Sequence, residues 1–410
     1  MSKQFVRNIG TVLSGTLAAQ FIPIAGTLVL ARIFSPGSFG IYSAWLGLVM
    51  FLAVVLTCRF EMALAVEADG NPRKRAAYST IATICITSSG AFAMLAGASW
   101  LDLEFLGKFS GGLLLLLVPT AAVLAATQTY QNWAAADGRY TQLSLMRIAQ
   151  AGAIVVLQIC FGLLASKPFE LACGYFAGAL IGLLSGVLLT LREGDAPPSL
   201  HESLSGFWRR QRQFPMFSLP ADAVSAATAQ LPVVVVASRF GPEAAGLLAM
   251  AMRMVGAPMS MLSASVLDVF KRHAAQAFRE RQECRKQYLY SFWLLCIVSV
   301  VSTIFIFFLA EPFFRAFFGE SWAGAGAIAL LLLPRFALGF VASPLSYIVY
   351  IVGKQHIDLF WQLSLLAMTL ASLLLADSFH AALLIYAAGY GFLYILYIWM
   401  SYSFSLGERR

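Results

Sequence analysis

Long apolar runs recur along the whole chain, and short polar stretches separate them. Each run is close to the roughly 20 residues that cross a bilayer as a helix. Transmembrane strands would instead need alternating segments of about ten residues, and these runs do not alternate. We therefore predict an all-α polytopic membrane protein of about twelve transmembrane helices. The predicted helices cover 9–32, 40–66, 78–100, 111–135, 142–165, 169–191, 214–237, 244–268, 288–310, 322–352, 357–376 and 380–404.

Composition supports this class of protein. Hydrophobic residues make up 60% of the chain and charged residues 12%, whereas about a quarter of an ordinary soluble domain is charged. The six cysteines show neither metal-ligand spacing nor the pattern of a disulfide framework, so we assign them no role. The first apolar run lacks a convincing cleavage site and is interpreted as the first transmembrane helix.

Basic residues set the expected orientation. Twenty of the 28 Lys and Arg residues fall on the side of the predicted N-terminus, and five fall on the opposite side. Cytoplasmic loops carry the excess of positive charge, so both termini are predicted to be cytoplasmic. The net charge of +8 then reflects topology and attraction to anionic headgroups, and it gives no reason to expect nucleic acid as a partner.

Two pairs of similar segments within the chain indicate an internal repeat. The turn 31–40 matches 237–246 at alanine, phenylalanine, proline and glycine positions, and the interval 119–139 matches 334–354 in its proline, glycine and basic residue. Six helices per half would make the halves parallel repeats, with a substrate path between them. The predicted organisation is an N-terminal six-helix bundle, a cytoplasmic linker and a C-terminal six-helix bundle, with bounds 1–195, 196–213 and 214–410.

Several short stretches resemble the polysaccharide and O-antigen repeat-unit flippases. These flippases form a branch of the multidrug/oligosaccharidyl-lipid/polysaccharide exporter superfamily. The similarity extends over essentially the whole chain, and its motifs are diffuse patterns rather than a catalytic signature. The residues that carry it are 34–40, 59–64, 128–140, 318–326, 343–345 and 353–355.

The resemblance implies a fold and a function. The expected fold is a V-shaped pair of six-helix bundles that alternates access across the bacterial inner membrane. The expected substrate is an undecaprenyl-diphosphate-linked oligosaccharide, moved from the cytoplasmic to the periplasmic leaflet for O-antigen, capsule or exopolysaccharide synthesis. The resemblance allows a polysaccharide polymerase and a chain-length protein as partners. The sequence does not show whether the protein works with either of them.

Arginines inside apolar runs are the first candidates for substrate binding. A charge in hydrocarbon costs about 2.5–3.5 kcal/mol on insertion scales, so each such residue suggests a function. Arg253 and Arg335 are expected near the bilayer midplane, and Arg59 near the cytoplasmic end of its helix. Their guanidinium groups could hold a lipid diphosphate through bidentate hydrogen bonds. The alternative is structural pairing, such as Arg59 with Glu61 or Asp222 with a neighbouring arginine.

Two carboxylates within these runs are candidates for ion coupling. Asp222 and Glu61 could bind a coupling proton or a sodium ion, because burial favours the protonated form of a carboxyl group. Nothing in the sequence selects between the two ions. No other cofactor and no metal site is predicted.

Amide side chains are candidates for contact with sugars. Gln128, Gln131 and Asn132 share one face of a predicted helix, and Gln150 and Gln158 share a face of the next. We predict that Gln128, Asn132 and Gln150 contact substrate. The alternative is that the amides join neighbouring helices, as amides in membranes often do.

Two other functional classes fit the sequence less well. A membrane-embedded polymerase or ligase of lipid-linked glycans would need acid/base residues on an outer loop. The predicted outer loops are short, and the four histidines show no triad or metal spacing, so no catalytic residue is assigned. A drug exporter of the same superfamily would favour carboxylates over arginines in its cleft. A transporter rather than an enzyme is therefore predicted.

Overall fold

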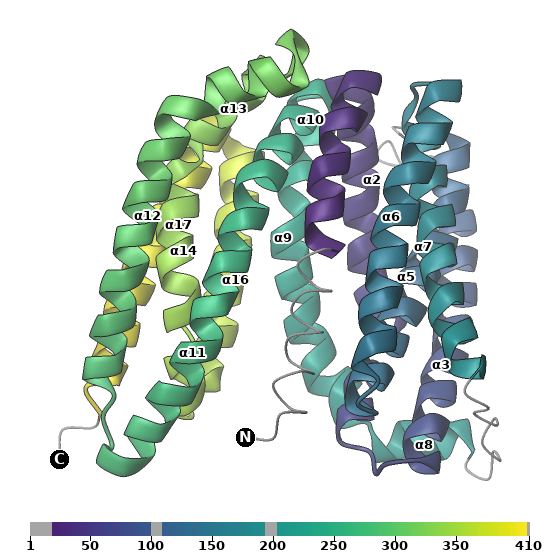
Figure 1. Ribbon diagram of the computed structural model, residues 1–410, viewed down its shortest axis with the longest axis horizontal. Helices are drawn as coiled ribbons and strands as arrows, with labels where there is room; N and C mark the ends of the chain where they lie inside the picture. The colour runs from purple at the N-terminus through teal and green to yellow at the C-terminus, as the bar shows by residue number, and fades with distance from the viewer. Residues whose placement is uncertain (1–18, 100–108, 193–202, 408–410) are drawn as a thin grey trace. The chain divides into compact units, whose positions relative to one another are not determined.

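The computed structural model describes residues 19–99, 109–192 and 203–407, and its described part is helical without strands (Figure 1). Eleven helices in that part are long and apolar enough to cross a membrane, and a shorter apolar helix, Ala19–Ile33, precedes them. The prediction of an all-α polytopic membrane protein is confirmed. The beginning of the predicted first helix, 9–18, lies outside the described residues.

Contacts between residues divide the chain into two units, Met1–Gln230 and Leu231–Arg410. The boundary falls inside the helix Leu219–Arg239 rather than in the predicted linker. The proposed halves 1–195 and 214–410 stay a prediction about the repeat.

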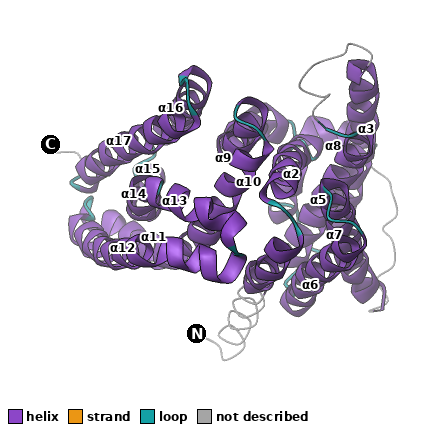
Figure 2. Ribbon diagram, turned by 90° about the horizontal axis from the view of Figure 1, so that it is seen from above, coloured by secondary structure: helices purple, strands orange, loops and turns teal. Residues whose placement is uncertain are grey.

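The first unit contains the helices that precede this boundary. Its helices α5, α6 and α7 lie side by side in both views (Figures 1 and 2), and α5 also packs on α2 and α3. After Ala19–Ile33, its elements are α2 (Pro36–Leu56), the 3₁₀ segment η1 (Phe60–Ala65), α3 (Asn71–Ser99), α5 (Gly111–Ala136), α6 (Tyr140–Leu164), α7 (Pro168–Arg192), α8 (Leu204–Arg210), the π-helix η2 (Phe214–Ser218) and α9 (Leu219–Arg239).

The second unit is centred on α14 and α17, which pack on each other; α14 also contacts α11 and α12. Its elements are α10 (Pro242–Ala251), the π-helix η3 (Met252–Gly256), α11 (Ala257–Arg281), α12 (Arg285–Phe313), the π-helix η4 (Phe314–Phe318), η5 (Glu320–Trp322), α13 (Ala323–Leu331), α14 (Leu333–Leu345), α15 (Ile348–Ile351), α16 (Gln355–Leu375) and α17 (Phe379–Ser405).

Two predicted helices end or break where the sequence suggested continuity. The helix predicted over 40–66 ends at Leu56, because the backbone turns through two positive-φ residues at 58 and 59. The helix predicted over 322–352 is three helices, because the chain leaves helical geometry at Leu332, just before Pro334, and again near 346. Proline lacks the amide hydrogen that an unbroken helix would use.

The helices predicted over 244–268 and 288–310 leave a loop at 269–287, and the prediction of this loop is wrong over most of its length. α11 continues to Arg281, and the chain turns at Gln282 in the left-handed conformation. Phe270, Ala274 and Ala277 are buried at helical spacing within the charged stretch. Their i, i+4, i+7 pattern predicts an amphipathic helix despite the many basic residues between them.

The two pairs of similar segments, 31–40 with 237–246 and 119–139 with 334–354, share backbone geometry. Pro36 and Pro242 each lie in the first turn of a helix, where the missing amide hydrogen costs nothing. Gly138 and Gly353 both have φ near +74°, at +73° and +74°. In each case the next amide donates to the carbonyl oxygen five residues earlier, over 2.8 Å from Arg139 and 2.9 Å from Lys354. Both turns are therefore Schellman-type helix ends.

Part of the predicted linker forms a helix that packs on the first unit. The side chain of Ser203 caps α8, and the Phe207 ring lies 5.2 Å from that of Phe60 in the core. The indole N–H of Trp208 donates to the hydroxyl of Thr83 over 2.8 Å, and Gln211 donates to the carboxylate of Glu67 over 2.7 Å. Residues 196–202 of the linker lie outside the described part.

Four glycines let α7 pack closely on its neighbours. A Cβ at Gly174 would lie 2.7 Å from the backbone of Gln158, and one at Gly178 would overlap the backbone of Ile154. Small residues at a spacing of four allow helix backbones to approach in membranes. The spacing of four is visible in the sequence. The stripe comprises Gly174, Gly178, Gly182 and Gly186.

We predict that Gly178→Ala destabilises the protein, by about 1–3 kcal/mol, because the added methyl group overlaps the α6 backbone. The measurement is the melting temperature of the full-length protein in detergent. Gly152→Ala on α6 is the matched control, since a Cβ there meets no atom within 4 Å. Equal melting temperatures for the two variants would contradict the close packing.

Candidate functional site

The connection after α2 positions the first group of charged candidates. The hydroxyl of Thr57 accepts from the backbone N–H of Arg59 over 3.1 Å and donates to the carbonyl of Val54 over 3.0 Å. Cys58 and Arg59 both have positive φ, at 48° and 59°. Arg59 therefore lies in a tight turn rather than inside a helix, which corrects its predicted position.

Arg59 binds the two carboxylates that were predicted to couple ions. Its Nε lies 2.7 Å from Oδ2 of Asp222 on α9, and its terminal nitrogen lies 2.8 Å from Oε1 of Glu61. Glu61 is 1% exposed, and its second carboxylate oxygen has no hydrogen-bond partner among the described residues. The cluster carries a net negative charge if all three groups are ionised.

This pairing changes what Arg59 can offer a substrate. A guanidinium that already faces two carboxylates has a weaker positive field than an unpaired one. The geometry agrees with the structural pairing considered as the alternative. A substrate role for Arg59 stays a prediction.

Arg335 has a different environment in the second unit. The side chain follows Pro334 in the first turn of α14, and its guanidinium carbon lies 5.5, 5.3 and 5.0 Å from the ring centroids of Phe336, Tyr386 and Tyr390. No carboxylate pairs with it in the part of the chain that the structure describes, and its Nε has no hydrogen-bond partner there. Aromatic faces partly compensate a buried cation, and here they leave the Nε donor available to an anion.

A cavity of about 210 Å³ lies beside Arg335 within the second unit. Three serine hydroxyls and the Tyr394 ring line it, together with apolar residues of α11 and α14. Ser263 donates weakly to the carbonyl of Phe340 over 3.4 Å. The cavity therefore combines one cation with neutral hydroxyl groups. Its polar lining residues are Ser260, Ser263, Ser343, Arg335 and Tyr394.

Arg253 lies in a local distortion of the long helix α10–α11. It is the second residue of the π-helix Met252–Gly256, and Pro258 follows at the start of α11. π-Bulges in long helices occur frequently at functional sites. Arg253 is half-buried, and its predicted substrate role stays untested.

Some of the amide candidates join neighbouring helices, and others have side-chain groups without a partner or exposed on the surface. Gln158 is 2% exposed and donates to the Tyr42 hydroxyl over 2.8 Å and to the Leu171 carbonyl over 3.1 Å, so it joins helices. The side-chain carbonyl of Gln128 is buried without a hydrogen-bond partner in the described chain, whereas Asn132 is exposed.

Gln150 and Gln131 also have neighbours within the first unit. A Cβ on Gly182 would touch the Cβ of Gln150, so the stem of this glutamine packs where α6 meets α7. Gln131 accepts a hydrogen bond from Nε of Arg147 over 3.2 Å. Substrate contact by Gln128, Asn132 and Gln150 stays a prediction.

The tyrosines around Arg335 were not among the predicted site residues. Tyr386, Tyr390 and Tyr394 follow one another at intervals of four on α17, which places them on one face of the helix. The rings of Tyr386 and Tyr390 lie 4.6 Å apart, and the Tyr390 hydroxyl lies 2.7 Å from that of Thr369. Repeated tyrosines in an apolar helix are the signal that could have predicted a partner for the arginine.

Solved structures share the fold of this chain. The lipid II flippase MurJ in an inward closed conformation aligns with a TM-score of 0.76 at 12% identity, over 95% of this chain and 87% of that one. An inward-facing multidrug resistance MATE family transporter aligns with a TM-score of 0.66 at 15% identity, over 93% of each chain. At these identities the likeness concerns the fold alone.

Sequence comparison gives a more specific relationship. The chain is 24% identical over 379 residues to the succinoglycan biosynthesis transport protein ExoT of Rhizobium meliloti, covering 88% of this chain and 72% of that protein. The family model described as polysaccharide biosynthesis protein matches residues 29–327, well over half of the sequence. The expected resemblance is confirmed, and this chain belongs to the polysaccharide biosynthesis protein family.

Proposed function

We propose that this protein is a flippase that moves a lipid-linked oligosaccharide from the cytoplasmic to the periplasmic leaflet of the bacterial inner membrane. The substrate class is an undecaprenyl-diphosphate-linked repeat unit for a surface polysaccharide. The family and the transport function named for its succinoglycan relative support this proposal, as does the fold it shares with MurJ.

The unpaired cation Arg335 is the observation that carries the proposal. A diphosphate that leaves the headgroup region loses hydration, and a guanidinium can replace it with charge-assisted hydrogen bonds. Arg335 has an available Nε donor beside a cavity that holds three serine hydroxyls. A cationic drug would be repelled at this position, which disfavours the drug-exporter alternative.

Transport explains the polar residues better than glycan polymerisation does. Polymerisation needs acid/base groups aligned on a reacting centre. The charged groups described above are instead paired with each other, as at Arg59, or surrounded by aromatic rings, as at Arg335. A polymerase and a chain-length protein remain proposed partners in the same pathway, and both termini are proposed to be cytoplasmic.

We predict that Arg335→Gln lowers transport of the lipid-linked oligosaccharide about 10- to 100-fold, because a hydrogen bond to a charged group contributes about 1.5–3 kcal/mol. The measurement is recovery of surface polysaccharide in a deletion strain, with the leaflet of the accumulated lipid-linked units determined in parallel. Units trapped in the cytoplasmic leaflet are expected.

Arg315→Gln is the matched control in the same unit, since Arg315 forms only an exposed ion pair with Glu320. It is expected to retain full transport. Normal export by Arg335→Gln would remove Arg335 from the substrate site. Accumulation in the periplasmic leaflet of the deletion strain would point to a polymerase instead.

We further propose that Glu61 couples transport to a proton or a sodium ion. Its second oxygen is buried without a hydrogen-bond partner in the described chain; a sodium ion would coordinate this oxygen, and a proton would neutralise it. Asp222 shares Arg59 with it, so a change at one carboxylate reaches the other through a common partner.

Glu61→Gln is predicted to abolish the response of transport to an imposed ion gradient while leaving the protein folded. Glutamine keeps the size of the side chain and cannot bind a coupling ion by charge. The measurement is flipping in proteoliposomes under a pH gradient or a sodium gradient, with Glu320→Gln as an exposed-carboxylate control. If wild-type transport ignores both gradients, ion coupling at Glu61 is excluded.

A further inference from the structure

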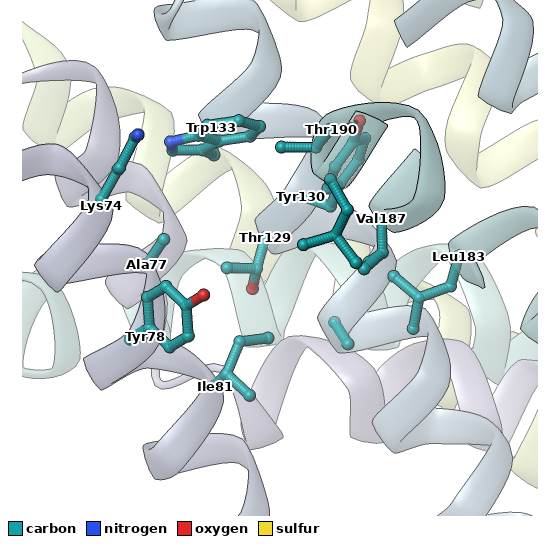
Figure 3. A pocket seen from close by; sticks show the side chains of 12 residues that line it. Lys74, Ala77, Tyr78, Ile81, Thr129, Tyr130, Trp133, Leu183, Val187 and Thr190 are labelled. Atoms are coloured by element: carbon teal, nitrogen blue, oxygen red, sulfur yellow. Dashed lines mark hydrogen bonds between the residues drawn. The ribbon is translucent and has the colours of Figure 1, made fainter. Parts of the chain in front are cut away.

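A second cavity lies within the first unit, away from the charged residues discussed above. It has a volume of about 270 Å³ and lies between α3, α5 and α7 (Figure 3). Most of its lining is apolar, with Ile81, Leu183 and Val187 among the side chains. Tyr78 and Leu191 on its rim are 51% and 59% exposed, so the cavity opens on the surface of the bundle.

The nitrogen donors of this cavity lie at one end. Figure 3 shows the ammonium of Lys74 and the indole nitrogen of Trp133 on the same side of the pocket. Trp133 is 6% exposed, yet its N–H has no hydrogen-bond partner among the described residues. A buried donor without an acceptor is costly, so this group indicates a missing acceptor.

The helix ends place these donors at a membrane interface. Lys74 is in the first turn of α3, Trp133 in the last turn of α5 and Thr190 in the last turn of α7. Leu183 lies seven residues before Thr190, which is roughly 10 Å deeper at 1.5 Å per residue. The cavity is thus polar at the headgroup level and apolar toward the hydrocarbon.

We propose that this cavity binds one anionic phospholipid of the surrounding bilayer. The phosphate would accept hydrogen bonds from the Lys74 ammonium and the Trp133 indole, and an acyl chain would fill the apolar part. The lysine ammonium and the indole N–H are donors of the kind that a phosphodiester oxygen accepts from.

This site is separate from the proposed substrate site in its residues and in its unit. Arg335 and its cavity belong to the second unit, whereas every residue of the lipid cavity belongs to the first. If the lipid-binding proposal fails, the proposed transport function is therefore unaffected. If the transport function fails, the lipid-binding proposal is likewise unaffected.

The test is native mass spectrometry of the full-length protein released from detergent with phosphatidylglycerol or phosphatidylcholine of the same acyl chains. Wild type is expected to retain phosphatidylglycerol about fivefold better, the effect of one lysine near a membrane surface. Lys74→Gln should remove this preference. Trp133→Phe, which removes the indole N–H donor together with part of the bicyclic ring, should weaken retention of phosphatidylglycerol about fivefold.

Lys167→Gln provides the matched control, because Lys167 is exposed beside the start of α7, at the opposite end of the same unit. It should retain phosphatidylglycerol as wild type does. Melting temperatures establish that each variant is folded, and Lys74→Gln carries the test if Trp133→Phe is not. Equal retention of both lipids by wild type, or displacement of phosphatidylglycerol by equimolar undecaprenyl phosphate, would overturn the proposal.

Discussion

The need to satisfy polar groups where water is absent governs this structure. Hydrocarbon offers no hydrogen bonds, so each buried charge must find partners in the protein or in a ligand. Arg73 illustrates the complete case: it is almost fully buried, and its guanidinium donates to the carbonyl oxygens of Leu64, Glu67 and Ala136. It also forms an ion pair with Asp69 over 2.6 Å. It ties the segment after α2, the start of α3 and the end of α5 together.

Arg59 and Arg335 represent two other solutions to the same constraint. Two carboxylates compensate Arg59, whereas aromatic rings surround Arg335 and leave a donor available. The first arrangement fixes a turn and the beginning of α9. The second preserves a cation in a cavity, which is the property that binding an anionic substrate requires.

The sequence predicted the all-α membrane class and, approximately, the number of spans, because long apolar runs are local signals. It did not predict the break at Leu332 or the extension of α11 to Arg281, since proline can begin a helix and basic residues can belong to one. The candidate residues were chosen for a charged or an amide side chain within an apolar run. Which of them are paired depends on contacts distant in sequence, such as Arg59 with Asp222, and a single sequence does not contain that information.

The glycine stripe of α7 has a mechanical consequence. Side chains normally act as a compliant layer between helices and allow them to slide by changing rotamers. Where the backbones of α6 and α7 meet at Gly174 and Gly178, that layer is absent. Sliding or rotation of one helix against the other would force main-chain atoms into overlap. During any conformational cycle α6 and α7 are therefore expected to move together as one rigid unit. Bending must then occur in other helices of the protein.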